Sequence, residues 1–126
     1  MTAIEFVFLT PLVFGVIFLT VQFAMYYFAT HVAQAAARAG AREARAQAAV
    51  DGSNWEGKAH TKATDYIHQL GGSLLTSATI SVKKDANDPE QVVVEVTGHV
   101  PSILGIDITI DEISKGPIER FVPAGG

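Results

Sequence analysis

Four histidines are the side chains of this chain with the clearest capacity for metal chemistry. They are His31, His60, His68 and His99. His60 and His68 lie eight positions apart, whereas two zinc ligands on one helix face require a spacing of four residues. We therefore interpret the histidines as surface residues and expect no metal site at them.

Oxygen-bearing side chains cluster at Asp85, Asn87, Asp88 and Glu90. Oxygen ligands suit calcium, but this segment lacks the glycine and the bidentate glutamate of an EF-hand loop. We interpret it as a solvated turn. No glycine-rich phosphate loop, nucleophile elbow or paired-carboxylate motif stands out, and the chain has no cysteine. We expect no enzymatic activity and no cofactor.

Glu5 is the acidic residue in the most unusual setting, because a long uncharged run follows it. Residues 6–29 contain no charged side chain, and about 20 apolar residues suffice to span a bilayer as a helix. Tyr26 and Tyr27 near its end suit a membrane interface. No basic residue precedes the run, and it is longer than the apolar core of a signal peptide. The sequence therefore predicts a membrane-spanning helix.

A carboxylate at the edge of the hydrocarbon layer is costly unless water or a cation accompanies it. Glu5 either lies hydrated among the headgroups or pairs with a positive group from elsewhere, such as an N-terminal ammonium. Pro11 removes a backbone donor and predicts a kink or a loosened turn. The orientation stays open: Arg38, Arg42 and Arg45 after the run favour a cytoplasmic C-terminal part, whereas a basic leader would reverse this.

The helical pattern continues past the uncharged run, since residues 30–50 contain no proline and are rich in helix formers. We expect one helix of roughly 45 residues, half in lipid and half projecting. Small residues recur at every fourth position in two rows, which allows helices to approach closely. One row is Ala29, Ala33, Ala37 and Ala41, and the other is Ala36, Gly40, Ala44 and Ala48. We predict that they pack against neighbouring helices; an alanine-rich solvent-exposed helix is the alternative.

A second, amphipathic helix is expected from Trp55 to Leu70. Ser53 and Glu56 have the spacing of a capping box at its start, and Gly71 supplies a stop. This helix should pack on the domain that follows.

Alternation with a period of two then predicts antiparallel strands. The first two strands form a hairpin across the turn at 85–90. The expected fold class is α+β, with a long N-terminal hydrophobic helix, a second amphipathic helix and a small three- to four-stranded antiparallel sheet. The strands are expected near 80–83, 92–97 and 106–110, with a short fourth strand at 118–122. Residues 1–52 would form the transmembrane or filament-core helix and residues 53–126 a small head domain.

The charge and size of the chain bear on its partners. A net charge of −4 argues against nucleic-acid binding, which favours a basic surface. A soluble domain of roughly 70 to 80 residues is marginal by itself, and without disulfides self-association is the expected support.

Both ends of the chain resemble the TadE-like pilins, relatives of the type IV pilins. The resemblance rests on Thr2-Ala-Ile-Glu-Phe6, on Leu9-Thr-Pro-Leu12 and the long helix, and on the closing Gly116-Pro-Ile-Glu-Arg-Phe121. It implies a membrane-held precursor whose basic leader a prepilin peptidase removes before Met1. The Met1 amine would then pair with Glu5 of an adjacent subunit, and Pro11 would be where the helix unwinds during assembly. Met1 departs from the phenylalanine common in type IV pilins.

We therefore expect a pilin or pilin-like subunit that is membrane-anchored before assembly and extracellular in a pilus afterwards. Its implied partners are copies of itself, membrane lipid, the prepilin peptidase and the pilus assembly machinery. A minor pilin or pseudopilin that binds a target or primes assembly is an alternative. A single-pass membrane scaffold with a cytoplasmic domain is another.

Overall fold

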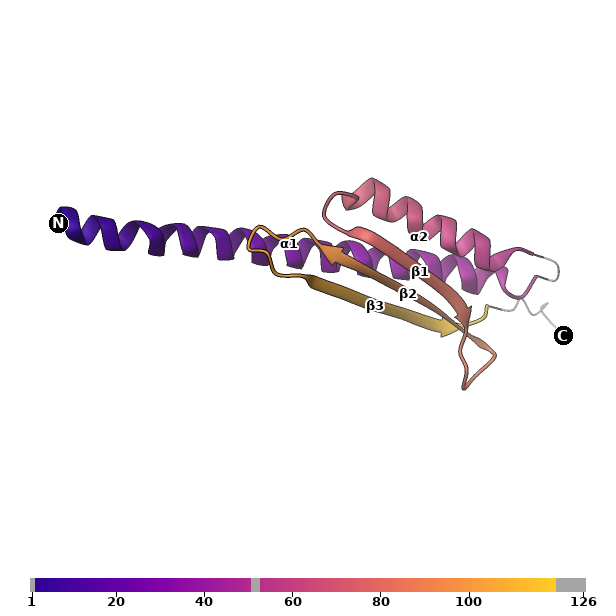
Figure 1. The fold of residues 1–126 in the computed structure, drawn as a ribbon. Coiled ribbons are helices and arrows are strands. Elements are labelled where there is room, and N and C mark those ends of the chain that lie inside the picture. Colours follow the sequence, from indigo (N-terminus) through magenta and orange to yellow (C-terminus); the bar gives the residue numbers. More distant parts are fainter. Residues whose placement is uncertain (1, 51–52, 120–126) are drawn as a thin grey trace.

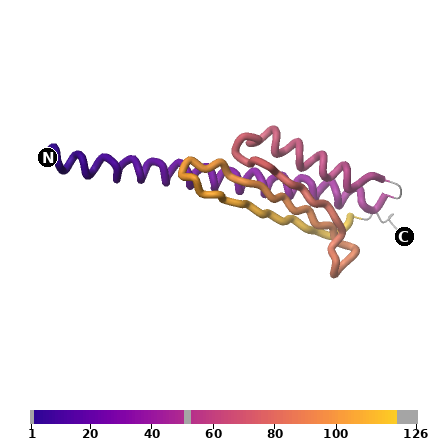
Figure 2. Tube along the Cα trace, viewed as in Figure 1, coloured from indigo at the N-terminus to yellow at the C-terminus, as the bar shows by residue number. Residues whose placement is uncertain are grey.

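The fold joins one long helix to a small α+β head (Figure 1). The computed structural model describes residues 2–50 and 53–119. In chain order the elements are α1 (Ala3–Gln47), α2 (Trp55–Gly71), β1 (Thr76–Lys84), β2 (Gln91–Val100) and β3 (Ile108–Pro117). The tube in Figure 2 shows that the N-terminal half of α1 projects alone, while its C-terminal half lies within the head. The predicted α+β class is confirmed.

The helix α1 is a single element of 45 residues, as the sequence predicts. It begins with a capping box: the Thr2 hydroxyl accepts from the Glu5 backbone N–H at 3.3 Å, and the Glu5 carboxylate accepts from the Thr2 N–H at 3.2 Å. The helix continues through Pro11, and Figure 1 shows no sharp bend in its indigo part. The loss of one donor at Pro11 leaves the neighbouring turns intact, so the expected loosening does not interrupt α1.

The predicted cap of α2 is wrong by one residue. Asn54 is the N-cap and its side chain accepts from the Gly57 N–H at 3.3 Å. The Ser53 hydroxyl instead donates to the Gln47 carbonyl at 2.7 Å, at the end of α1. Because Ser53 satisfies an orphan carbonyl of α1, the next residue caps α2.

The three strands form an antiparallel sheet in the order β1-β2-β3. The central strand β2 pairs with both others; Val94, for example, lies opposite Val82 on one side and Ser114 on the other. The predicted third strand begins too early, because Ile106 lies in the loop before β3. The possible fourth strand is absent at residues 118–119, and residues 120–122 lie outside the described part of the chain.

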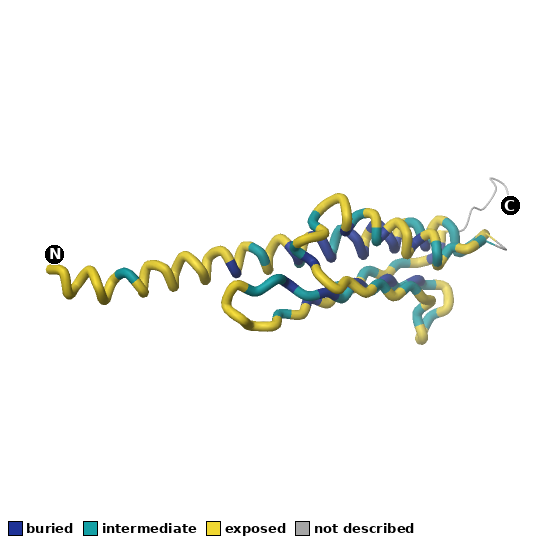
Figure 3. Tube along the Cα trace, turned by 45° about the horizontal axis from the view of Figure 1, so that its top comes forward, coloured by how far each residue is buried: buried dark blue, intermediate teal, exposed yellow. Residues whose placement is uncertain are grey.

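The core lies between the sheet, α2 and the C-terminal half of α1. Val92, Val94 and Val96 of β2 are fully buried. Figure 3 shows buried residues concentrated in the head and exposed residues along the projecting part of α1. At Gly40 an added Cβ would lie 3.1 Å from Val94 Cγ1 and 3.2 Å from the Ala59 carbonyl oxygen, so glycine permits this close approach.

Candidate functional site

The projecting half of α1 presents an apolar surface that no other described residue covers. From Ile4 to Val21 every large apolar residue is exposed, with exposed fractions between 41% at Leu9 and 76% at Phe8. Such a surface is far larger than the apolar patches that monomeric soluble proteins carry. It therefore requires lipid or other protein around it.

A membrane is one environment that suits this surface. Among the described residues, α1 is the one helix long and apolar enough to span a membrane, judged by length and composition. None of its most apolar 18-residue window is buried. The core helix of a soluble protein would be mostly covered by its own domain, so that interpretation does not fit.

Glu5 lies at the tip of this surface, in the capping box with Thr2. Its Oε2 atom accepts from the Thr2 N–H, and its Oε1 atom has no hydrogen-bond donor among the described residues. Water or a cation from another molecule therefore has access to one carboxylate oxygen. The predicted partner, the amine of Met1, lies outside the described residues, so the Glu5–Met1 pairing stays a prediction.

The small-residue rows lie inside the head rather than on its surface, except for Ala48, which is partly buried. They do bring a helix close to α1, but that helix is α2 of the same chain, together with β2. At these positions the close approach of helices occurs within the chain, and a contact with neighbouring subunits stays a prediction. The buried members include Ala29, Ala33, Ala36, Ala37, Gly40 and Ala44.

A basic groove runs along α1, with side chains of α2 and β3 completing its lining. Its lining includes Arg38, Arg42, Arg45, Tyr66 and Lys115. Arg45 is occupied: its Nε donates to the Pro117 carbonyl at 2.9 Å and its Nη2 lies 3.4 Å from the Glu119 carboxylate. Arg38 and Arg42 are exposed and make no ion pair within the described residues. Their charges face solvent.

Sequence reasoning missed Gln22, which anchors the head to the apolar run. Its side chain is 5% exposed. The Nε2 atom donates to the Pro101 carbonyl at 3.3 Å, and Oε1 accepts from the Ile103 N–H at 2.9 Å. A glutamine inside an uncharged apolar run was the available signal, because a polar group at such a position usually has a specific partner.

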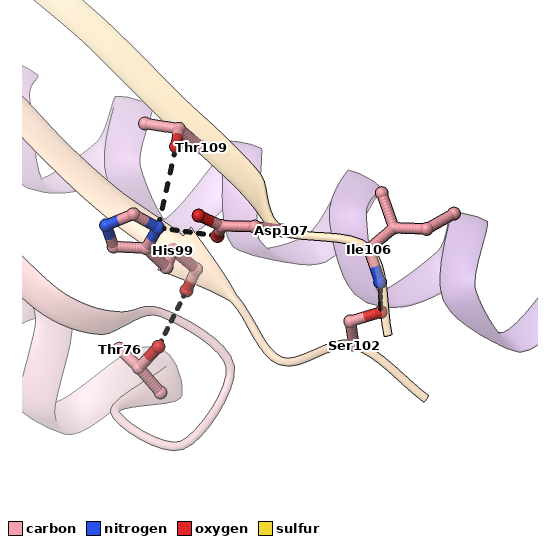
Figure 4. Close-up of polar contacts among 6 residues, drawn as sticks. All are labelled: Thr76, His99, Ser102, Ile106, Asp107 and Thr109. Atoms are coloured by element: carbon pink, nitrogen blue, oxygen red, sulfur yellow. Dashed lines mark hydrogen bonds and ion pairs between the residues drawn. The ribbon is translucent and has the colours of Figure 1, made fainter. Parts of the chain in front are cut away.

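The loop that Gln22 binds, residues 101–107 between β2 and β3, is held by further polar contacts (Figure 4). The Ser102 hydroxyl accepts from the Ile106 N–H at 2.9 Å. At the base of the loop, His99 Nδ1 lies 2.9 Å from the Asp107 carboxylate. The interpretation of His99 as a surface residue did not include this pair.

The other polar clusters have structural roles. Asp85 Oδ1 accepts from the Asn87 N–H and Asp88 Oδ1 from the Glu90 N–H, both at 3.0 Å, which are the local bonds of a tight turn. His31 packs edge-on against Tyr27, with ring centroids 4.5 Å apart. Over residues 2–50 and 53–119, no three His, Cys, Asp or Glu side chains gather in a way that could hold a metal ion.

Comparison with known proteins gives a match for the N-terminal third of the chain. Residues 1–42 match the family model described as TadE-like protein, which confirms the resemblance for the segment that contains Glu5 and Pro11. The match does not extend to the closing segment at 116–121. No curated protein and no solved structure matches the chain. The TadE-like segment and the apolar helix together fit a protein related to the Tad pilus.

Proposed function

We propose that this chain is a pilin or pilin-like structural subunit. It is held in the membrane by α1 as a precursor and polymerises through the N-terminal half of α1 into an extracellular pilus. The observation that carries the proposal is the continuity of α1: one helix combines an uncovered apolar half with a half buried in a packed head. In this role the chain is structural rather than enzymatic.

The energetics of assembly follow from the uncovered half of α1. Transfer of its apolar side chains into water would cost about 25 cal/mol for each Å² exposed. A bilayer before assembly and a bundle of neighbouring α1 helices afterwards both avoid that cost. Extraction from lipid into the bundle exchanges one apolar environment for another, so the driving force has to come from specific contacts.

Glu5 supplies such a contact. Its carboxylate would meet the N-terminal amine of an adjacent copy inside an apolar bundle, where charges attract more strongly than in water. One pair per subunit would fix the axial register of neighbouring helices. The prepilin peptidase and the pilus assembly machinery are the further partners in this proposal, which the TadE-like match supports.

Two substitutions separate the charge of Glu5 from its capping role. Glu5→Gln keeps an oxygen that can accept from the Thr2 N–H, because glutamine also serves in a capping box, but removes the charge. Thr2→Val removes the capping hydroxyl and keeps the charge. We expect sheared filaments to fall at least about ten-fold with Glu5→Gln, which corresponds to about 1.4 kcal/mol per subunit contact, and to stay near wild type with Thr2→Val.

The amount of each variant in the carbonate-resistant membrane fraction is the control and should equal that of the wild type. Wild-type filament yield from Glu5→Gln would refute the charge-pairing step. Equal losses in both variants would assign the effect to the helix start instead. A wild-type chain that is recovered from cells only as a membrane monomer would contradict the subunit role and favour a single-pass scaffold.

A further inference from the structure

We propose that the loop between β2 and β3, residues 101–107, is a second membrane contact that inserts into the lipid interface beside α1. The occupant of this surface is the bilayer before assembly. The inference rests on the membrane-anchored state in the proposed function and is independent of polymerisation.

The tip of the loop is apolar and uncovered. Ile103, Leu104 and Ile106 are 47%, 40% and 56% exposed. No charged residue lies among them; the charged residue of the loop, Asp107, lies at its base and pairs with His99. In Figures 1 and 2 this loop is the part of the head that reaches furthest toward the projecting half of α1. The apolar tip therefore faces the side of the head from which the membrane span emerges.

The two hydrogen bonds from Gln22 fix the depth of the loop. They attach Pro101 and Ile103 to a residue inside the uncharged run. The loop therefore cannot lie above the membrane while the helix beside it is in the membrane, unless both bonds break.

Helix geometry shows how deep that position is. Glu5 and Gln22 are roughly 17 residues apart, which is about 25 Å along a helix, whereas the hydrocarbon layer is about 30 Å thick. With Glu5 at one face of the layer, the other face falls roughly 20 residues later, near Met25. Any tilt of the helix moves that face to a still later residue. The level of Gln22 thus lies at the inner edge of the interface, and the loop meets lipid there.

Several backbone N–H groups of the loop are already paired within the chain, which suits a lipid environment. The Ile103 N–H is bound by Gln22, and the Leu104 and Ile106 N–H groups donate to the Ser102 hydroxyl at 3.2 and 2.9 Å. Unpaired backbone donors would make entry into lipid costly, and these three are paired within the chain. Gly105 has a φ of +75°, which lets the tip turn back without strain.

Aromatic residues on α1 mark the same level. Phe23, Tyr26 and Tyr27 are exposed just after Gln22, and tyrosine is enriched where helices leave a bilayer. A neighbouring copy of the chain is the other possible cover for the loop. The depth argument and the aromatic residues favour lipid, so a protein cover becomes an outcome of the test.

The chain has no cysteine, so single cysteines can report position along it. Leu104→Cys probes the loop, Leu12→Cys the span, and Ile113→Cys is the matched control. Ile113 is 57% exposed on β3 and lies about 23 Å from Ile106 along an extended strand. Each full-length variant is labelled with a small environment-sensitive fluorophore and reconstituted at low density in 3:1 phosphatidylcholine–phosphatidylglycerol vesicles with nitroxide-labelled lipids.

We expect the nitroxide lipids to quench the labels at 104 and 12 at least three-fold more than the label at 113. Quenching at 104 should be strongest with a shallow nitroxide and should not depend on protein density. If the label at 104 is quenched no more than the label at 113 while the label at 12 is quenched, the loop inference is wrong and membrane anchoring stands. If the label at 12 is also not quenched, α1 is not anchored in the membrane, and the inference is wrong as well. Quenching or protection at 104 that appears only at high protein density would overturn the inference in favour of a neighbouring copy.

Discussion

The side-chain oxygen of Gln22 accepts a hydrogen bond from the Ile103 backbone at 2.9 Å, across 81 positions of sequence. Through this bond the last loop of the sheet is attached to the C-terminal part of the apolar run. The head therefore starts within the run rather than after it, and the aromatic residues that follow Gln22 lie beside the head.

Gln22→Leu should release this attachment. Two hydrogen bonds are lost and the Ile103 N–H loses its acceptor, so the free energy of unfolding should fall by about 1–3 kcal/mol. Hydrogen exchange of the full-length protein in detergent should become faster at residues 101–107. Thr20→Val is the control, because the Thr20 hydroxyl binds the Val16 carbonyl of its own helix. Unchanged exchange at the loop would contradict the anchoring role of Gln22.

Ala37→Leu should destabilise the head itself. Ala37 is 1% exposed and belongs to the core, and extra methylene groups in a packed core typically cost about 1–3 kcal/mol. The measurement is the urea midpoint of the full-length protein in detergent, followed by Trp55 fluorescence.

Ala46→Leu tests whether any added bulk on α1 has the same effect. Ala46 is exposed on the same helix, so its variant should have a midpoint close to the wild type. A stable head in Ala37→Leu combined with a loss of filaments would return the small-residue rows to a role between subunits.

Gly98→Ala should also destabilise the core. An added Cβ would lie 2.5 Å from Leu75 Cδ1 and 2.8 Å from Leu75 Cγ, and Leu75 is 2% exposed. We expect a loss of about 1–3 kcal/mol in the same urea titration. Gly72→Ala is the matched control, since an added Cβ there would meet its nearest atom at 3.7 Å. Equal stability of the two variants would show that Leu75 can repack.

Arg45→Ala should loosen the segment after β3. Arg45 binds that segment three times: through the Pro117 carbonyl, the Glu119 carboxylate and its own carbonyl, which accepts from the Glu119 N–H at 3.0 Å. The substitution removes the two side-chain contacts. Because the arginine is about one-third exposed, we expect a loss of about 1 kcal/mol or less.

Arg42→Ala is the control for Arg45, because Arg42 is exposed and has no ion-pair partner in the described residues. Its effect on stability should stay within about 0.5 kcal/mol. Faster hydrogen exchange at the Glu119 amide should distinguish the two variants. Equal exchange in both would mean that backbone contacts alone hold this segment.

Local patterns were sufficient for most of the elements. The length of α1 follows from an unbroken series of helix formers, and Gly71-Gly72 ends α2 near the predicted place. Alternation identified β1 and β2, because β2 buries one face and β1 partly buries Ile80 and Val82. The start of β3 was missed because Ile106 continues the alternation, while the Ser102 hydroxyl accepts from the Ile106 N–H and keeps that residue in the loop.

Some features of the candidate site were also predictable from local sequence, and others were not. The uncovered apolar half of α1 was predictable because no tertiary contact alters it. The partner of the small-residue rows was not predictable, because a row of alanines can pack against a helix of the same chain as well as against a helix of another subunit. The capping box of Glu5 was visible in Thr2-x-x-Glu5, a spacing that we read only as a family resemblance.

By itself, the sequence determined that this protein has a long helix with an apolar N-terminal half, since these properties depend on composition and on neighbours within a few turns. The tertiary structure decided which face of α1 lies in the head, where the head begins at Gln22, and which loop lies beside the apolar run of α1. Those features depend on contacts between segments tens of residues apart, and local periodicity carries no information about which distant groups will meet.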